Sequence, residues 1–247
     1  MAKQRYKRVQ AGRLVREALW TPVFPYDTPA QRAAKSRVSS AARKKINQRL
    51  AWKKLMLLLA ANFTGRDLHV VLTYDDDHLP ANAAAARKFI KRFLAALRQH
   101  RRAKGEELLY IYNIEGRHGS GRLHHHIVLK AGDKDVLQKL WPYGLVLPPH
   151  RIDRYGYSGL AQYLTKEARE ESAPVGARSW VGSLNLQKPA EAPTEWVPDS
   201  IRLEPPTNAY ILERDEQSNE FGRFQYVEYL LPDPPLGRRV RPPQRKE

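Results

Sequence analysis

The segment from residue 108 to residue 130 restricts the fold more than any other part of the sequence. It holds two apolar stretches, Leu108–Glu115 and Leu123–Lys130, separated by a turn that contains three glycines. Strand-forming stretches on either side of a glycine-rich turn predict an antiparallel β-hairpin. Upstream, Leu68–Tyr74 predicts another strand, and Ala83–Arg102 carries its apolar residues on one stripe, as an amphipathic helix does.

Shorter elements are expected after the hairpin. They are a short helix around Lys134–Leu140, a strand near Leu145–Ile152 and a helix from Ser158 to about Arg169. The resulting order, β-α-β-β-α-β-α, predicts an α+β domain in which helices pack against a central antiparallel sheet. Two more strands are expected at Tyr210–Arg214 and Phe224–Leu230.

Composition divides the chain into three zones. Residues 1–30 contain three prolines and predict an irregular arm, whereas residues 30–62 lack Pro and Gly and predict one or two basic helices. Eleven of the 18 prolines lie beyond Ser172. We therefore expect three regions, at 1–62, 63–172 and 173–247, of which the last is a Pro-rich accessory segment with a mobile tail.

The formal charge of +17 is concentrated near the N-terminus, where 15 of the 43 Lys and Arg residues lie between Met1 and Ala60. This concentration favours a polyanionic partner, because each neutralised phosphate releases condensed counterions. A solvated basic face is the alternative. We expect DNA contacts from six basic side chains of this zone: Arg43, Lys44, Lys45, Arg49, Lys53 and Lys54. Base-stacking surfaces are available at Trp52, Tyr74 and Trp141, although core packing is the better interpretation of Trp141.

Composition also excludes several classes of protein. The absence of cysteine excludes disulfide scaffolds, thiolate metal sites and a cysteine nucleophile. The longest apolar run, Leu55–Ala61, is far shorter than the roughly 20 residues needed to span a bilayer. Because the N-terminus is basic with no apolar stretch behind it, we expect a cytoplasmic protein with no membrane partner.

Three consecutive histidines on the second hairpin strand carry the first chemical signal. Side chains alternate between the two faces of a strand, so His124 and His126 point the same way and His125 points the opposite way. Two imidazoles on one strand face can clamp a divalent cation. Surface exposure or core packing of the histidines would explain the same triplet without a metal.

A carboxylate at the end of the preceding strand strengthens the metal interpretation. The hairpin turn brings Glu115 beside the start of the histidine strand. Two imidazoles and one carboxylate leave coordination positions open for a substrate oxygen, as in a site for Mg²⁺ or Mn²⁺. The turn does not define the strand register, so Asn113 and His118 compete for the third ligand position, and Glu115 has Arg117 as another partner.

A tyrosine and a lysine on the last predicted helix carry the second signal. Tyr163 and Lys166 are three residues apart and therefore share one helix face. An ordinary phenol is protonated at neutral pH and is a weak nucleophile, which a nearby ammonium and a metal-polarised phosphate would activate. Packing and solvation would also explain such a pair. Tyr157 is a second candidate, but it precedes the expected helix start at Ser158.

The motifs resemble those of the HUH single-strand DNA endonucleases, which include rolling-circle replication initiators, relaxases and some transposases. Val70–Tyr74, followed by the polar loop Asp75–Pro80, is similar to the first initiator motif. Leu123–Leu129 resembles the metal-binding strand of that family, and Tyr163 with Lys166 resembles its single-tyrosine motif. The resemblance covers about residues 65–170 and implies a ferredoxin-like catalytic domain. His125 departs from the pattern, since the family has an apolar or aromatic residue there.

The resemblance also implies a mechanism. Tyr163 would attack single-stranded or hairpin DNA at a replication origin, leaving a 5′-phosphotyrosine and a 3′-hydroxyl for a host polymerase. His124, His126 and Glu115 would hold Mg²⁺ or Mn²⁺. Lys166 would position the phosphate or a metal-bound water. Because the sequence has no P-loop pattern, we expect a separate helicase.

Three alternatives remain open at this point. An HUH relaxase or transposase would use the same chemistry, although relaxases typically use three histidine ligands, and Glu115 therefore favours an initiator. A metal-dependent phosphodiesterase would use water and would not need Tyr163. In a non-catalytic DNA-binding protein, the basic arms would act alone and the histidines would be incidental.

Overall fold

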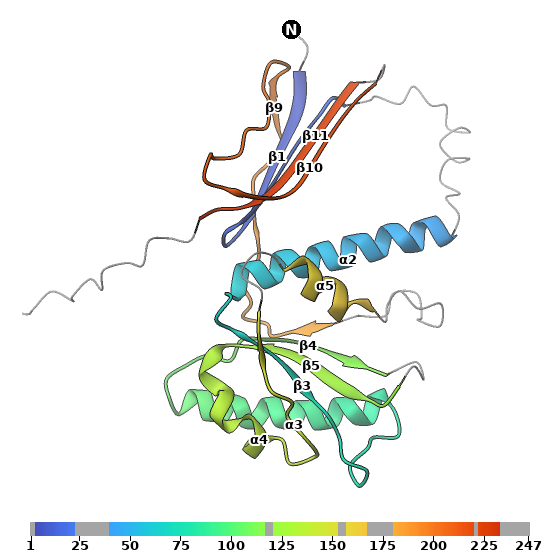
Figure 1. The fold of residues 1–247 in the computed structure, drawn as a ribbon, viewed down its shortest axis with the longest axis vertical. Helices are drawn as coiled ribbons and strands as arrows, with labels where there is room; N and C mark the ends of the chain where they lie inside the picture. The colour runs from blue at the N-terminus through green and yellow to red at the C-terminus, as the bar shows by residue number, and fades with distance from the viewer. Residues whose placement is uncertain are drawn as a thin grey trace, which may run out of the picture. The chain divides into compact units, whose positions relative to one another are not determined.

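The computed structural model describes residues 3–22, 40–116, 121–152, 157–166, 180–219 and 222–232. The chain forms two compact units (Figure 1). One consists of Phe24–Pro189, and the other combines Met1–Val23 with Ala190–Glu247. Each unit contains its own β-sheet.

The unit formed by Phe24–Pro189 contains a five-stranded sheet in the order β6-β3-β5-β4-β7. Every neighbouring pair is antiparallel, which confirms the predicted antiparallel sheet and α+β class. The strands are β3 (Leu68–Leu72), β4 (Tyr110–Glu115), β5 (His124–Leu129), β6 (His150–Arg151) and β7 (Val181–Gly182).

Helix α3 (Ala83–Arg102) packs its apolar stripe against one face of this sheet. It begins at the predicted residue because the Asn82 side chain accepts hydrogen bonds from the first backbone amides. A 3₁₀ turn (Ala131–Val136) and helix α4 (Leu137–Leu140) lie on the same side (Figure 1). The core between these layers includes fully buried Ile90, Ile127 and Trp141, and the burial of Trp141 confirms its predicted packing role.

Helices α2 (Ser40–Asn62) and α5 (Ser158–Leu164) lie over the opposite face (Figure 1). They pack against each other. The Tyr157 hydroxyl, at the start of α5, donates a 2.6 Å hydrogen bond to the carbonyl of Phe63, just beyond α2. A basic helix was predicted within residues 30–62, and α2 confirms it for residues 40–62. Residues 23–39 lie outside the described part of the chain.

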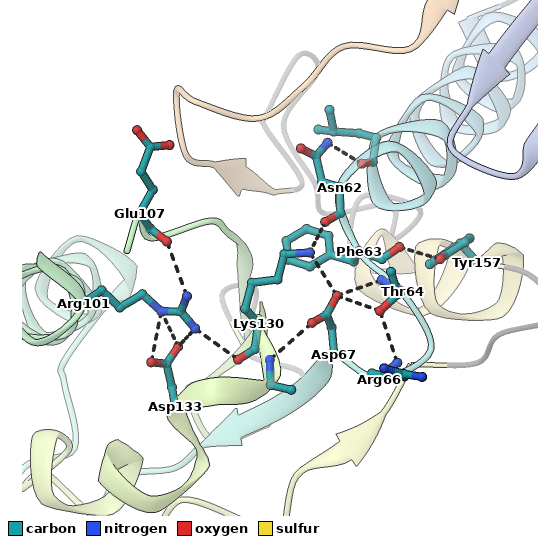
Figure 2. Close-up of polar contacts among 12 residues, drawn as sticks. Asn62, Phe63, Thr64, Arg66, Asp67, Arg101, Glu107, Lys130, Asp133 and Tyr157 are labelled. Atoms are coloured by element: carbon teal, nitrogen blue, oxygen red, sulfur yellow. Dashed lines mark hydrogen bonds and ion pairs between the residues drawn. The ribbon is translucent and has the colours of Figure 1, made fainter. Parts of the chain in front are cut away.

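A polar network fixes the start of β3 and the end of β5 (Figure 2). The Asp67 carboxylate accepts hydrogen bonds from Lys130 Nζ at 3.2 Å and from the backbone amide of Thr64 at 2.8 Å. Close by, the buried Arg101 guanidinium makes a bidentate ion pair with Asp133. These contacts anchor one end of the central strands, and the histidines and Glu115 lie toward the other end.

The second unit corrects one prediction. Residues 3–20 form two paired strands, β1 (Lys3–Ala11) and β2 (Leu14–Trp20), and the irregular arm predicted for them is wrong. The strands join partners about 200 residues away, in the sheet order β10-β11-β2-β1-β8 with β9 also beside β1. In such charged sequence, pairing of β1 with β2 and of both with distant strands outweighs local propensity.

The remaining strands of this sheet come from the C-terminal zone. They are β8 (Ala190–Glu191), β9 (Glu195–Pro198), β10 (Tyr210–Asn219) and β11 (Gly222–Leu230). The predicted strands at 210–214 and 224–230 are confirmed, and both extend further than the sequence indicated. Glu17 is buried in this sheet, where its carboxylate accepts hydrogen bonds from the Tyr6 and Tyr229 hydroxyls.

Among the described residues, no helix is long and apolar enough to cross a bilayer.

Candidate active site

The hairpin register brings the predicted ligands together on one face of the sheet. Strand β5 pairs Glu115 directly with His124, and Asn113 directly with His126. Residues paired across antiparallel strands project to the same face, so the two histidines and the glutamate share the face that α2 and α5 cover. The period-two prediction for the histidines is therefore confirmed. The strand register was the part that the sequence left open.

The three side chains form a compact donor group. One potential ligand atom from each of Glu115, His124 and His126 lies within 4.8 Å of the others. Glu115 Oε2 is 2.9 Å from His126 Nε2 and 3.6 Å from His124 Nε2, and the two histidine nitrogens are 3.1 Å apart. Two imidazoles and a carboxylate converging in this way fit a divalent cation and leave room for substrate oxygens.

Of the two competing third ligands, the structure describes only Asn113. The Asn113 side chain is buried, and its amide donates a 3.0 Å hydrogen bond to the Leu164 carbonyl at the end of α5. Asn113 therefore ties the sheet to the helix that carries Tyr163. His118 and Arg117 lie outside the described residues.

Tyr163 on α5 and Lys166 just after it lie over the donor group. The helix predicted from Ser158 to about Arg169 ends at Leu164, because the backbone leaves the helical conformation at Thr165, and Lys166 therefore does not share a helix face with Tyr163. Tyr163 is 40% exposed, and its hydroxyl is 3.4 Å from His126 Nε2. Lys166 Nζ lies 4.3 Å from the centre of the Tyr163 ring and 2.5 Å from Glu115 Oε1. The other tyrosine candidate, Tyr157, is buried with its hydroxyl on a backbone carbonyl.

Burial and neighbouring charges set the protonation of these groups. Burial alone would raise the pKa of Glu115, but Lys166 and the two histidines together hold this pKa below its ordinary value. Burial, with the nearby His124, lowers the pKa of His126 to about 4. The hydrogen bond to Glu115 raises the pKa of Lys166. At neutral pH the site thus presents a carboxylate, a neutral His126 imidazole and an ammonium.

A fourth histidine, which was not predicted from the sequence, supports His126. His69 on β3 lies with its Nε2 atom 3.1 Å from His126 Nδ1, and the two rings stack with centres 5.2 Å apart. Burial lowers the pKa of His69 to about 4, so this ring is also neutral at pH 7. The sequence feature that could have indicated this role is a single histidine within the apolar strand Leu68–Leu72.

His125 points into the core on the other face of the sheet. It is fully buried, and its Nε2 atom lies 2.6 Å from the Tyr74 hydroxyl. Burial lowers the pKa of His125 to about 3 and raises that of Tyr74. The prediction that Tyr74 stacks on a DNA base is therefore wrong, because its ring is buried against Phe89 and Trp141.

The predicted DNA-binding residues of the basic zone lie on α2. Lys54 is exposed, and Lys53 is half-buried with its ammonium 5.7 Å from the centre of the Trp52 ring. For Arg43, Lys44, Lys45 and Arg49, only the backbone lies within the described structure. DNA contact by this helix remains a prediction.

A comparison with protein families gives a match that spans the candidate site. Residues 67–171 match the family model described as Replication-associated protein ORF2, a family of rolling-circle replication initiators. The matched segment lies within the unit formed by Phe24–Pro189 and contains the three donor residues, Tyr163 and Lys166. No curated protein and no solved structure matches the chain. The match confirms the resemblance inferred from the motifs and supports a role in replication initiation, with DNA at an origin as partner.

Proposed function

We propose, from this family match and from the position of Tyr163 over the Glu115 group, that the protein is a rolling-circle replication initiator that nicks and rejoins single-stranded DNA. The observation that carries the proposal is the convergence of five side chains of four chemical kinds. A carboxylate, two imidazoles and a phenol meet within hydrogen-bonding distances, and an ammonium lies against them.

Glu115, His124 and His126 would hold the divalent cation, either Mg²⁺ or Mn²⁺. When bound there, the ion would act as a Lewis acid on the scissile phosphate. The lowered pKa values of Glu115 and His126 keep both groups in the forms that bind cations at neutral pH. The chemistry and spacing of the donors support this assignment.

Tyr163 would be the nucleophile. Its phenolic oxygen forms a bond to phosphorus while the bond from phosphorus to O3′ breaks, giving a 5′-phosphotyrosine and a free 3′-hydroxyl. The phenolic proton passes to solvent, and the departing 3′ oxygen takes a proton from solvent, so the step is balanced. Rejoining is the reverse transfer. The 40% exposure of Tyr163 leaves its hydroxyl within reach of a DNA strand.

Lys166 would act on both the ligand and the nucleophile. Its ammonium holds Glu115 Oε1, which leaves Oε2 directed toward the histidines. The same ammonium lies over the Tyr163 ring, where it would stabilise negative charge on the phenol and on a bound phosphate. This role extends the phosphate-positioning role predicted from the sequence.

The other parts of the proposal concern partners and domains. The released 3′-hydroxyl would be extended by a host polymerase in the cytoplasm of a bacterial cell, with strand separation by a separate helicase. Residues 1–62 would contribute DNA contacts through α2, residues 63–172 would carry the chemistry, and residues 173–247 would be accessory. The carboxylate ligand favours an initiator over a relaxase, in which three histidines are typical.

The test is incubation of the full chain with labelled single-stranded and hairpin DNA in Mn²⁺, followed by a denaturing gel. We expect a covalent protein–DNA band that is lost in Tyr163→Phe, in His126→Ala and with EDTA. Tyr210→Phe removes an exposed phenol from the other unit and should leave the band unchanged. Cleavage without an adduct would replace the proposal with a metal-activated water mechanism, and binding without cleavage would replace it with a non-catalytic DNA-binding role.

A further inference from the structure

We propose that Leu145 and Leu147 form an apolar ledge that binds an unpaired base of the single-stranded DNA, close to the scissile phosphodiester. We call these two side chains the leucine ledge. The proposal rests on the proposed function, because it names the part of the same substrate that this surface recognises.

Backbone hydrogen bonds place the ledge along the edge of β3. The Thr73 amide donates to the Leu145 carbonyl and the Leu147 amide donates to the Val71 carbonyl, each at 2.9 Å. Between them, Val146 pairs with Leu72 and packs against the core below the sheet. Because side chains alternate along an extended segment, Leu145 and Leu147 project from the opposite face.

That opposite face is the one that carries the candidate active site. Leu147 lies beside Val71, and Val71 pairs with His126 on the next strand. Neighbouring strands are about 4.8 Å apart, so the backbones at Leu147 and His126 are separated by about 10 Å. A DNA strand whose scissile phosphate lies at His126 and Tyr163 would therefore pass near the leucine ledge.

The ledge is held rigidly. The Gln138 side chain accepts a 2.9 Å hydrogen bond from the Val146 amide and donates a 3.0 Å hydrogen bond to the Gly144 carbonyl. A Cβ at Gly144 would collide with the carbonyl oxygen of Thr73, so glycine is needed where the segment turns onto β3. A surface already fixed in place loses little conformational entropy on binding.

Exposure of the two leucines points to a ligand with an apolar face. Leu145 is 65% exposed and Leu147 is 39% exposed, although Val146 between them contributes to the core. A single exposed leucine needs no explanation. Two neighbouring leucines on a fixed edge, on the same face as the nucleophile and the donor group, match the flat apolar face of an unstacked base, which DNA enzymes hold between apolar or aromatic side chains.

The test measures binding separately from chemistry. In a Tyr163→Phe background, fluorescence anisotropy compares a labelled oligothymidine with an abasic oligomer of the same length, which has the phosphates but no bases. We expect the Leu145→Ala/Leu147→Ala double variant to bind oligothymidine about fivefold to tenfold more weakly and the abasic oligomer equally well. Leu184→Ala is the matched control, because Leu184 is a fully exposed leucine of the same unit, close to β7 at the opposite sheet edge.

Each outcome decides the proposal. Equal weakening of binding to both oligomers would overturn the proposal. No weakening with either oligomer would also overturn it, and would indicate that the two leucines contact a protein partner instead. Both variants should melt at the parental temperature, because the altered side chains are exposed. If base-dependent weakening appears but the parent chain with Tyr163 forms no covalent adduct, the ledge stands and the nicking mechanism fails. If the adduct forms but base-dependent weakening does not appear, the nicking mechanism stands and the leucine ledge fails.

Discussion

His69 provides the sharpest prediction, because its ring nitrogen lies against a proposed metal ligand. For His126 to offer a lone pair at Nε2, its proton must lie on Nδ1. The atom facing Nδ1 is His69 Nε2 at 3.1 Å, and the lowered pKa of His69 keeps its ring neutral, so that one of its two nitrogens has a free lone pair. We predict that His69 carries its proton on Nδ1, accepts this hydrogen bond at Nε2, and so selects the His126 tautomer that binds a metal.

The expected effect follows from losing this one hydrogen bond. In His69→Phe the aromatic packing is retained, but the buried Nδ1–H of His126 has no acceptor at this position, at a cost of about 1–3 kcal/mol. Removing an outer partner of this kind typically lowers metal affinity by about 10-fold to 100-fold. We expect a decrease of this size in Mn²⁺ affinity, measured by titration calorimetry on the full chain.

His69→Gln is the control, because its amide oxygen can accept the same hydrogen bond, and we expect it to recover most of the affinity. Melting temperatures without metal separate this effect from a loss of folding. Wild-type Mn²⁺ affinity in His69→Phe would refute the tautomer argument.

Three further predictions test other parts of the structure. Asn113→Ala removes the hydrogen bond that ties the sheet to α5, and we expect single-turnover adduct formation to slow by up to about tenfold with Mn²⁺ affinity unchanged; a parallel decrease in metal affinity would contradict this. The folded-state pKa of His125 is about 3, below the ordinary value of 6.5, so its stabilising contribution is complete above pH 6.5 and is lost as the pH falls toward 3. In urea unfolding, the stability of wild type relative to His125→Phe should therefore fall by about 1.4 kcal/mol per pH unit across this range, and a difference that does not vary with pH would refute the argument. Lys53→Gln with Lys54→Gln should flatten the salt dependence of single-strand binding by about 0.7 for each phosphate that is no longer neutralised, and an unchanged slope would exclude these lysines from the interface.

Much of the site was predictable from short-range patterns. Alternation along a strand placed His124 and His126 on one face, because it depends only on backbone geometry. Lys166 lies beyond the end of α5 at Leu164, so its position over the Tyr163 ring does not follow from the helix face that the sequence predicted. The glycine-rich turn indicated that Glu115 lies nearby. It did not indicate that Glu115 pairs with His124.

The errors concern contacts between distant residues. Tyr74 ends an apolar strand, and nothing in its neighbourhood shows that its hydroxyl meets His125 in the core. The strands of residues 3–20 were missed although they pair with each other, because their charged sequence gives a weak strand signal and their outer partners lie about 200 residues away. Such pairings depend on the packing of whole sheets, which local propensity does not report.

The sequence by itself determined which chemical groups are present and that His124 and His126 share one face of a strand. Only the tertiary structure decided that the Glu115 carboxylate lies beside the histidine pair, that α5 brings Tyr163 over it, and that His69 contacts His126. The physical reason is that periodicity follows from backbone geometry within a few residues. Strand register and the docking of a seven-residue helix follow from the packing of elements far apart in the chain.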